Sequence, residues 1–299
     1  MSFPSNPQKT LLIVNPVSGK RLIVRALPDV IRILMDAGYL VTTMVTEESG
    51  DATQFAAQFG REHDLIVCAG GDGTLNEVMT GLARKGISVP VGYLPCGSTN
   101  DFAASRGIPL NILQAAEDAA SGRIMSYDIG RFGDRYFTYT AAFGAFTSLS
   151  YNTDQNLKNM VGHAAYLMGG LIELSNIRPI PLRLTIDGTV LEGEFAFGAV
   201  CNTTSIGGTI FLPNDVVDLS DGRFELLLLH MPEDLIELEE IIQGLLAQDY
   251  SSPLIEFLQA RNITVESQEG LAWSLDGEDS GEFTKVEISV LSGFLKLRQ

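Results

Sequence analysis

The stretch that decides the fold is residues 64–77, DLIVCAGGDGTLNE, where an apolar run leads through glycines into a helical pattern. Asp64 to Ala69 predicts a buried strand. The helix that follows is indicated by apolar residues at helical spacing, namely Leu75, Val78, Met79, Leu82 and Ala83, and it ends at Lys85-Gly86. Backbone N–H groups at a glycine-rich helix start favour phosphate binding.

The same alternation of strand and helix runs through the first half of the chain. Further short strands are predicted at Thr10–Asn15, Tyr39–Val45 and Val89–Leu94. Helical patterns fall near residues 27–35, 55–59, 99–105 and 111–121. Such alternation predicts an α/β layer with a parallel sheet, whose ligand crevice lies beyond the carboxyl ends of the strands.

The second half is richer in strands. The Asp187-Gly188 pair predicts a hairpin turn. Other strand candidates are Tyr136–Phe143, Phe195–Cys201, Phe224–His230, Ile263–Glu266, Thr284–Leu291 and Phe294–Leu297, with helical patterns at 157–174 and 233–247. We therefore expect an α/β domain over residues 1–128 and a β-rich domain over residues 129–291, with residues 292–299 returning to the first domain.

Composition narrows the function classes. The 299 residues include 37 acidic and 20 basic side chains, a formal charge of −17, which argues against a general nucleic-acid binder. The three cysteines, Cys68, Cys96 and Cys201, have neither disulfide nor zinc spacing, which suits a reducing cytosol. With no leader and no apolar run of spanning length, we expect a soluble protein that touches a membrane only from outside.

Two loops follow the first and third predicted strands. The first, Asn15–Lys20 (NPVSGK), allows close backbone approach to an anion, although such residues also mark ordinary turns. The second, Gly70–Glu77, matches neither the dinucleotide nor the Walker pattern, and Asp72 in it could hold Mg²⁺. Thr74 and Glu77 have the spacing of a capping box, which predicts a structural role for Glu77.

A third loop, Pro95–Ala103 (PCGSTNDFA), follows the fourth predicted strand. Ser98 or Thr99 is a candidate helix N-cap, and Asn100 and Asp101 suit the first helical turn. Because carboxyl ends of parallel strands meet at one sheet edge, the three loops together predict a polyphosphate site.

NPVSGK, GGDGTLNEV and PCGSTNDFA, in that order, resemble the diacylglycerol kinase catalytic family of soluble lipid kinases, which is related to sphingosine kinases. GGDGT alone is shared with NAD kinases and phosphofructokinases. The resemblance continues through the second half of the chain, at Gly162–Leu167, Asn202–Gly208, Leu212-Pro213, Asp218–Phe224 and Ser274–Glu278.

The resemblance implies a three-layer α/β domain, a C-terminal β-sandwich and an active site in the cleft between them. It also implies transfer of the ATP γ-phosphoryl group to a lipid hydroxyl, with ATP and Mg²⁺ as cofactors. The residues that it places at the nucleotide are Asn15, Pro16, Val17, Ser18, Gly19, Thr46, Gly70, Gly71, Asp72, Gly73, Thr74, Leu75, Asn76, Gly97 and Ser98.

The resemblance also assigns acids. Glu278 matches the family's proton acceptor, Asp276 is the other member of the catalytic acid pair, and Asp72 organises the nucleotide Mg²⁺. Asp218, Asp221 and Arg223 match a structural Mg²⁺ site, with backbone carbonyls as the ligands at Asp218 and Arg223. From the residues alone, Asp276–Glu278 reads equally as a solvated turn, and the Asp218–Asp221 segment as a plain β-turn.

The leading hypothesis is a diacylglycerol kinase-like enzyme, cytoplasmic and peripherally membrane-associated, with a homodimer expected only by analogy with the family. Basic clusters at Lys20-Arg21-Arg25, Arg84-Lys85 and Arg123 with Arg131 and Arg135 are candidates for membrane approach or ordinary solvated faces. The alternatives are a kinase of phosphatidylglycerol or of a sphingoid base. A kinase of NAD is disfavoured by the NPVSGK and PCGSTNDFA loops. A nucleotide- or lipid-binding regulator without turnover is the remaining alternative.

Overall fold

The computed structural model describes residues 7–144, 178–206, 210–213 and 215–299. The chain forms two compact units. The first comprises Met1–Ile129, Arg135–Thr138 and Leu291–Gln299, and the second comprises Gly130–Asp134 and Tyr139–Val290. The helix predicted at 157–174, the 162–167 motif and two glycines of the 202–208 motif lie outside the described residues.

A parallel sheet forms the centre of the first unit. Its strands follow the order β2-β1-β3-β4, and the end of β15 pairs parallel with β4 through Lys296 and Leu297. The bounds are β1 (Gln8–Val14), β2 (Tyr39–Val45), β3 (Leu65–Gly70), β4 (Pro90–Pro95) and β15 (Glu278–Arg298). Every residue of β3 is buried, which explains its uninterrupted apolar sequence.

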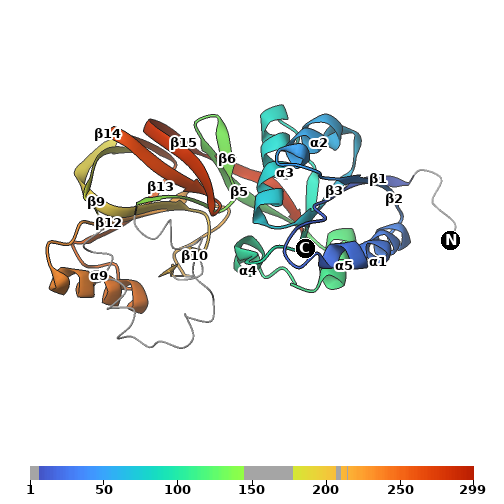
Figure 1. Cartoon of the computed structure of the whole chain (residues 1–299), viewed down its shortest axis with the longest axis horizontal. Helices are drawn as coiled ribbons and strands as arrows, with labels where there is room; N and C mark the ends of the chain where they lie inside the picture. Colours follow the sequence, from blue (N-terminus) through green and yellow to red (C-terminus); the bar gives the residue numbers. More distant parts are fainter. Residues whose placement is uncertain (1–6, 145–177, 207–209, 214) are drawn as a thin grey trace. The chain divides into compact units, whose positions relative to one another are not determined.

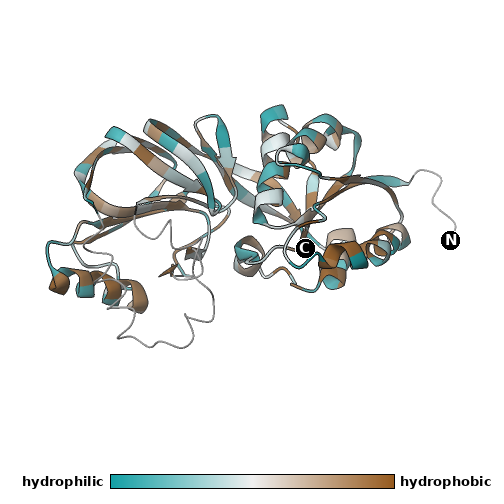
Figure 2. Ribbon diagram, in the orientation of Figure 1, coloured by the Kyte–Doolittle hydropathy of each residue, from teal (hydrophilic) through white to brown (hydrophobic). Residues whose placement is uncertain are grey.

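Helices cover both faces of this sheet, as Figure 1 shows. On one face, α1 (Leu22–Asp36) packs against α5 (Ile112–Ser121), and on the other α2 (Asp51–Phe59) packs against α3 (Asp72–Lys85). A short 3₁₀ helix, η1 (Gly60–Glu62), follows α2, and α4 (Asp101–Arg106) follows β4. Figure 2 shows hydrophobic residues along β1 and β3 and on the helices around them. The predicted three-layer α/β arrangement is confirmed.

The chain passes between the units inside two long strands, β5 (Ile124–Phe132), which the sequence pattern did not indicate, and β15. It also passes between them at both ends of the segment Arg135–Thr138. The sequence predicted two strands over 284–297, whereas β15 is one strand of 21 residues. Gly293, with φ of +57°, allows the backbone to deviate inside it without ending the strand. The single strand predicted at 136–143 is divided into β6 (Arg135–Phe137) and β7 (Thr140–Gly144).

The second unit is antiparallel. Hydrogen bonding follows the order β13-β12-β9-β7-β14-β15, while β8 pairs with both β9 and β14. The bounds are β8 (Ile180–Ile186), β9 (Thr189–Cys201), β12 (Phe224–His230), β13 (Ile255–Ala260) and β14 (Asn262–Leu275). The predicted Asp187-Gly188 hairpin is confirmed: Ile186 pairs with Thr189, and the two turn residues have φ of +46° and +92°.

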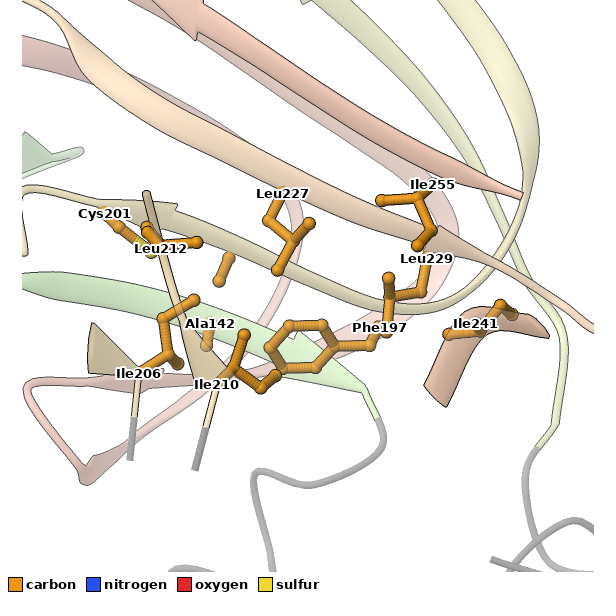
Figure 3. Packing of buried hydrophobic residues seen from close by; sticks show 11 residues of the cluster. Ala142, Phe197, Cys201, Ile206, Ile210, Leu212, Leu227, Leu229, Ile241 and Ile255 are labelled. Carbon is orange, nitrogen blue, oxygen red and sulfur yellow. The ribbon is translucent and has the colours of Figure 1, made fainter. Parts of the chain in front are cut away.

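One apolar cluster of the second unit lies on one face of its sheet. Figure 3 shows Phe197 of β9 beside Ile210, with Leu227 and Leu229 of β12 nearby. Strands β10 (Ser205–Ile206) and β11 (Ile210–Phe211) pack on this cluster through Ile206 and Ile210. Helix α9 (Leu235–Ala247) packs on it through Ile241. The predicted α/β class with a second, β-rich unit is therefore confirmed. No helix among the described residues is long and apolar enough to cross a membrane.

Candidate functional site

Three loops of the first unit meet beyond the carboxyl ends of β1, β3 and β4. A Cβ atom on Gly97 would lie 2.8 Å from the Gly71 Cα, and one on Gly19 would lie 2.3 Å from the Cys96 carbonyl oxygen. The loops thus approach at distances that only glycine permits. Three glycine-containing backbone segments lie together at one sheet edge, as the sequence predicted, and α3 begins there at Asp72. A helix start beside closely packed glycines suits an anion with several oxygens.

Side chains join the first two loops. The Asn15 amide donates to the Thr74 hydroxyl over 3.0 Å, and the Asn15 side-chain oxygen accepts from the Val17 backbone N–H at 3.1 Å. The capping box predicted at Thr74 is wrong, because α3 begins at Asp72 with Gly71 in the N-cap position. Thr74 therefore lies in the first helical turn, where its hydroxyl serves a residue 59 positions away.

Glu77 anchors the loop that follows β2. Its role is structural, as expected, but its partners lie in this loop and not at Thr74. Its carboxylate accepts from the backbone N–H groups of Gly50 and Ala52, at 2.9 and 3.2 Å, and from the Ser49 hydroxyl. These donors lie at the start of α2, where a carboxylate is favoured by the helix dipole. Glu77 therefore fixes the segment that follows Thr46, itself held to β1 by a 2.9 Å bond from its N–H to the Val14 carbonyl.

Asp72 links two helices and a strand. Its Oδ1 accepts from the Tyr93 hydroxyl at 3.1 Å and its Oδ2 from the Asp101 backbone N–H at 2.9 Å. Burial and the negative charge of Asp72 raise the pKa of Tyr93 well above its ordinary value. The Tyr93 hydroxyl therefore keeps its proton and donates to the carboxylate, which stays in place beside the glycines.

The third loop is closed by Asn100. Its side-chain oxygen accepts from the Gly97 N–H at 2.8 Å and its amide donates back to the Gly97 carbonyl at 3.0 Å. Asn100 is also the N-cap residue of α4, with φ of +56°, so the interpretation of Ser98 or Thr99 as the cap is wrong. Both hydroxyl residues are exposed instead, beside the half-buried Gly97.

The other nucleotide candidates divide by burial. Leu75 is fully buried in the core, so only its backbone is available to a ligand. Asn76 is half-buried and its amide donates to the Tyr136 carbonyl at 3.0 Å. Pro16, Ser18 and Gly73 are half-buried in the loops, and Gly70 is buried at the end of β3. Val17 is exposed by 64%.

In the second unit, Asp276 and Gly277 form a two-residue turn between β14 and β15. Their φ angles are +49° and +83°, as a type I′ turn requires, and Leu275 pairs with Glu278 across it. The Asp276 carboxylate is buried and accepts from the backbone N–H groups of Tyr139 and Thr140, at 2.9 and 3.0 Å. Glu278 is exposed at the first position of β15. The two acids thus have different environments.

The segment from Asp218 to Arg223 is a turn whose acids bond to their own backbone. Asp218 accepts from the Ser220 N–H at 3.0 Å, and Asp221 accepts from the Arg223 N–H at 2.8 Å. Among the residues that the structure describes, no three His, Cys, Asp or Glu side chains are close enough together to hold a metal ion. A cation at this turn would depend on backbone carbonyls together with the Asp221 carboxylate.

Sequence reasoning missed two groups. Tyr93 reads as one more apolar strand residue, and its bond to Asp72 leaves no trace in the pattern. Glu225 on β12 is fully buried, and burial raises its pKa to about 7, although the Gln259 amide donates to it at 3.2 Å. An acid between Phe224 and four leucines was the available signal. The three cysteines are buried free thiols, and burial raises the pKa of Cys96 to about 12.

Comparison with protein families gives two matches along the chain. Residues 9–132 match the model described as the diacylglycerol kinase catalytic domain. Residues 144–298 match the model described as the YegS C-terminal NAD kinase beta sandwich-like domain. The first match contains the three glycine loops, and the second contains both acidic turns.

Similar proteins cover the chain from end to end. A diacylglycerol kinase of Bacillus subtilis (strain 168) is 35% identical over 276 residues, which are 92% of this chain and 91% of the relative. A diacylglycerol kinase of Staphylococcus saprophyticus is 34% identical over 98% of this chain and 93% of its own length. The crystal structure of a diacylglycerol kinase from Bacillus anthracis str. Sterne superposes with a TM-score of 0.77 at 26% identity, covering 99% of this chain and 98% of that one.

Proposed function

Because the chain belongs to the diacylglycerol kinase catalytic family and is a lipid kinase with an alcohol acceptor, we propose that it transfers the γ-phosphoryl group of ATP to diacylglycerol. The product is then phosphatidic acid. The observation that carries the nucleotide half of this proposal is the meeting of three glycine loops at one sheet edge. In this proposal the first unit binds the nucleotide and the second binds the lipid.

The phosphates of ATP are placed against backbone N–H groups. The residues proposed to line them are those of the three loops, Asn15 to Gly19, Gly70 to Asn76, and Gly97 with Ser98, together with Thr46. Close glycine packing supports this, because it brings peptide dipoles within reach of one anion. Phosphoryl transfer depends mainly on positioning and charge neutralisation, which preorganised N–H donors supply.

Asp72 is the residue proposed to hold the nucleotide Mg²⁺. The carboxylate fits a hard cation that prefers oxygen ligands, and it stands at the start of α3 beside the glycine loops. When bound, Mg²⁺ neutralises charge on the transferring phosphates. Asp221, with the carbonyls of Asp218 and Arg223, is proposed as a second, structural Mg²⁺ site. Its place in a tight turn supports this, because a turn brings backbone carbonyls and a carboxylate together.

Glu278 is proposed as the group that accepts the proton of the lipid hydroxyl. The hydroxyl oxygen then forms its bond to the γ-phosphorus, and the bond to the β-phosphate oxygen breaks, which leaves ADP. The exposure of Glu278 supports this role, because an acceptor must be within reach of its substrate. The bonds of Asp276 to Tyr139 and Thr140 support a positioning role for Asp276, which shapes the turn that carries Glu278.

Membrane contact is proposed through the exposed start of α1. Lys20, Arg21 and Arg25 are exposed there beside Leu22, which is exposed by 55%, and Val24, which is exposed by 53%. Cations next to apolar side chains favour an anionic lipid surface even on a protein whose formal charge is −17. With three free buried thiols, a cytoplasmic location is the matching proposal.

A transfer assay with radiolabelled ATP and Mg²⁺ in mixed micelles tests the activity. The acceptors are diacylglycerol, monoacylglycerol, phosphatidylglycerol, ceramide and sphingosine, with NAD as a soluble control. Labelled phosphatidic acid is the expected product. A labelled product from another lipid would identify that lipid as the substrate in place of diacylglycerol. ATP binding without any labelled product would favour a nucleotide- or lipid-binding regulator without turnover.

Substitution at Asp72 tests the nucleotide site within the same assay. Asp72→Asn keeps the size of the side chain but removes its charge and replaces one acceptor oxygen by an NH2 donor. We therefore expect turnover to fall by about 10²-fold or more. Asp118→Asn, an acid on α5 of the same unit, is the control and should keep wild-type activity. Wild-type turnover in Asp72→Asn would remove Asp72 from the site.

A further inference from the structure

Tyr93 lies on β4, in the middle of the sheet and under the glycine loops. Only 1% of its surface is exposed. Its strand neighbour Gly92 faces α5, since a Cβ there would lie 2.4 Å from the Ala119 Cβ. Side chains alternate along a strand, so Tyr93 points to the opposite face, where α3 begins.

At that face the phenol is fixed in orientation. Its ring packs edge-on against Phe102 of α4, with ring centroids 5.7 Å apart. Its hydroxyl donates to Asp72 Oδ1 at 3.1 Å. Phenylalanine would fill the same space, so what tyrosine adds at this position is a hydroxyl that bonds to a carboxylate.

The second oxygen of Asp72 is held from another direction. Asp101 begins α4, and its backbone N–H donates to Asp72 Oδ2 at 2.9 Å. Donors that reach both oxygens from different elements define the plane of the carboxylate.

We propose that Tyr93 is a positioning residue for Mg²⁺–nucleotide binding, which acts by holding the Asp72 carboxylate in the orientation that receives the cation. This inference rests on the proposed function of Asp72. Groups that hydrogen-bond to metal ligands typically change metal affinity or activity by about 10–100-fold when they are removed. Tyr93 touches neither substrate nor cofactor in this scheme, and it acts through Asp72.

The test is Tyr93→Phe, with Tyr127→Phe as the matched control. Tyr127 is also a buried tyrosine of the first unit, and its hydroxyl accepts a 3.0 Å bond from the Gln299 amide instead of donating to Asp72. Calorimetric titration with ADP, in Mg²⁺ and in EDTA, gives the factor by which Mg²⁺ tightens nucleotide binding. The Mg²⁺ concentration that gives half-maximal turnover is the second readout.

We expect Tyr93→Phe to lower the Mg²⁺ factor for ADP about tenfold and to raise the half-maximal Mg²⁺ concentration to match. Tyr127→Phe should leave the Mg²⁺ factor and the half-maximal Mg²⁺ concentration at their wild-type values. This difference between the two variants should hold even where their melting temperatures are similar. Equal Mg²⁺ factors in Tyr93→Phe and wild type would overturn the inference. ADP binding that is insensitive to Mg²⁺ in the wild type would overturn it too.

These outcomes separate the inference from the proposed activity. If the wild type binds ADP in an Mg²⁺-dependent way but phosphorylates no lipid, the proposed function fails. The calorimetric comparison still decides the role of Tyr93 in that case, because it needs no turnover.

Discussion

Two turns of the second unit have the same construction and different neighbours. Asp187-Gly188 joins β8 to β9, and Asp276-Gly277 joins β14 to β15, all four residues with positive φ. In each turn the aspartate carboxylate accepts from two consecutive backbone N–H groups. The Asp187 carboxylate accepts from the backbone N–H groups of Arg261 and Asn262. The Asp276 carboxylate accepts from the backbone N–H groups of Tyr139 and Thr140.

The difference lies in burial and in the residue that follows. Asp187 is exposed, whereas Asp276 is exposed by only 4%. Thr189 follows the first turn and Glu278 follows the second. Because the turn geometry alone accounts for Asp and Gly in both places, only Glu278 needs a functional explanation. The comparison thus moves the catalytic proposal from the pair of acids to one of them.

The largest effect expected from this comparison is on turnover in Glu278→Gln. Loss of the proton acceptor should lower kcat by about 10²–10⁴-fold, while the dissociation constant for ADP stays at the wild-type value because Glu278 binds no nucleotide. Steady-state kinetics and calorimetry measure the two quantities. Asp279→Asn, which changes the neighbouring exposed acid, is the control. A weaker ADP affinity with kcat preserved would place Glu278 at the nucleotide.

The second effect is on stability, and it compares the two aspartates directly. Asp276→Ala leaves two buried N–H groups without their acceptor, so we expect the free energy of unfolding to fall by about 3 kcal/mol. Asp187→Ala exposes its two N–H groups to water, so the loss should be about 1 kcal/mol. Urea unfolding measures both. Equal losses would show that burial does not distinguish the turns.

Much of this arrangement follows from local sequence. Apolar runs and helical spacing predicted the parallel strands and helices of the first unit, because those elements are buried on regular faces. The glycine loops could be placed at one edge because parallel strands have their carboxyl ends together. Asp-Gly between strand patterns predicted the Asp187 turn, since type I′ turns require positive φ at both positions.

The features that were missed depend on residues far apart in the sequence. Thr74 was read as a cap because its partner, Asn15, is 59 positions away. Tyr93 lies within the strand predicted at Val89–Leu94, and nothing local to that strand reveals its bond to Asp72. The apolar pattern predicts two strands in place of β15, because Ser292-Gly293 interrupts it as a turn would. Only tertiary contacts decide these cases.

Glycine substitutions give the third prediction. Gly277→Ala and Gly188→Ala both place a Cβ at positive φ, and neither Cβ meets an atom closer than 3.8 Å. We therefore expect similar losses of about 1 kcal/mol in the free energy of unfolding. Only Gly277→Ala should also lower kcat, because it shifts the residue before Glu278. If both variants keep wild-type kcat, the geometry of the Asp276 turn does not control catalysis.

The smallest effect concerns the pH dependence of stability at the exposed turn. Burial raises the pKa of Asp187, but hydrogen bonds from Arg261 and Asn262 outweigh it, so the net shift is below the ordinary value. A lowered folded-state pKa stabilises the protein above the unfolded pKa, near 4, and this contribution is lost as the pH falls through the folded value. Since the group is exposed, its contribution is about 0.5 kcal/mol. Urea unfolding between about pH 3 and pH 7 should therefore show the difference between wild type and Asp187→Asn shrinking below about pH 4. A constant difference across that range would mean that the Asp187 charge contributes nothing to its turn. The two turns would then differ only in burial and in Glu278.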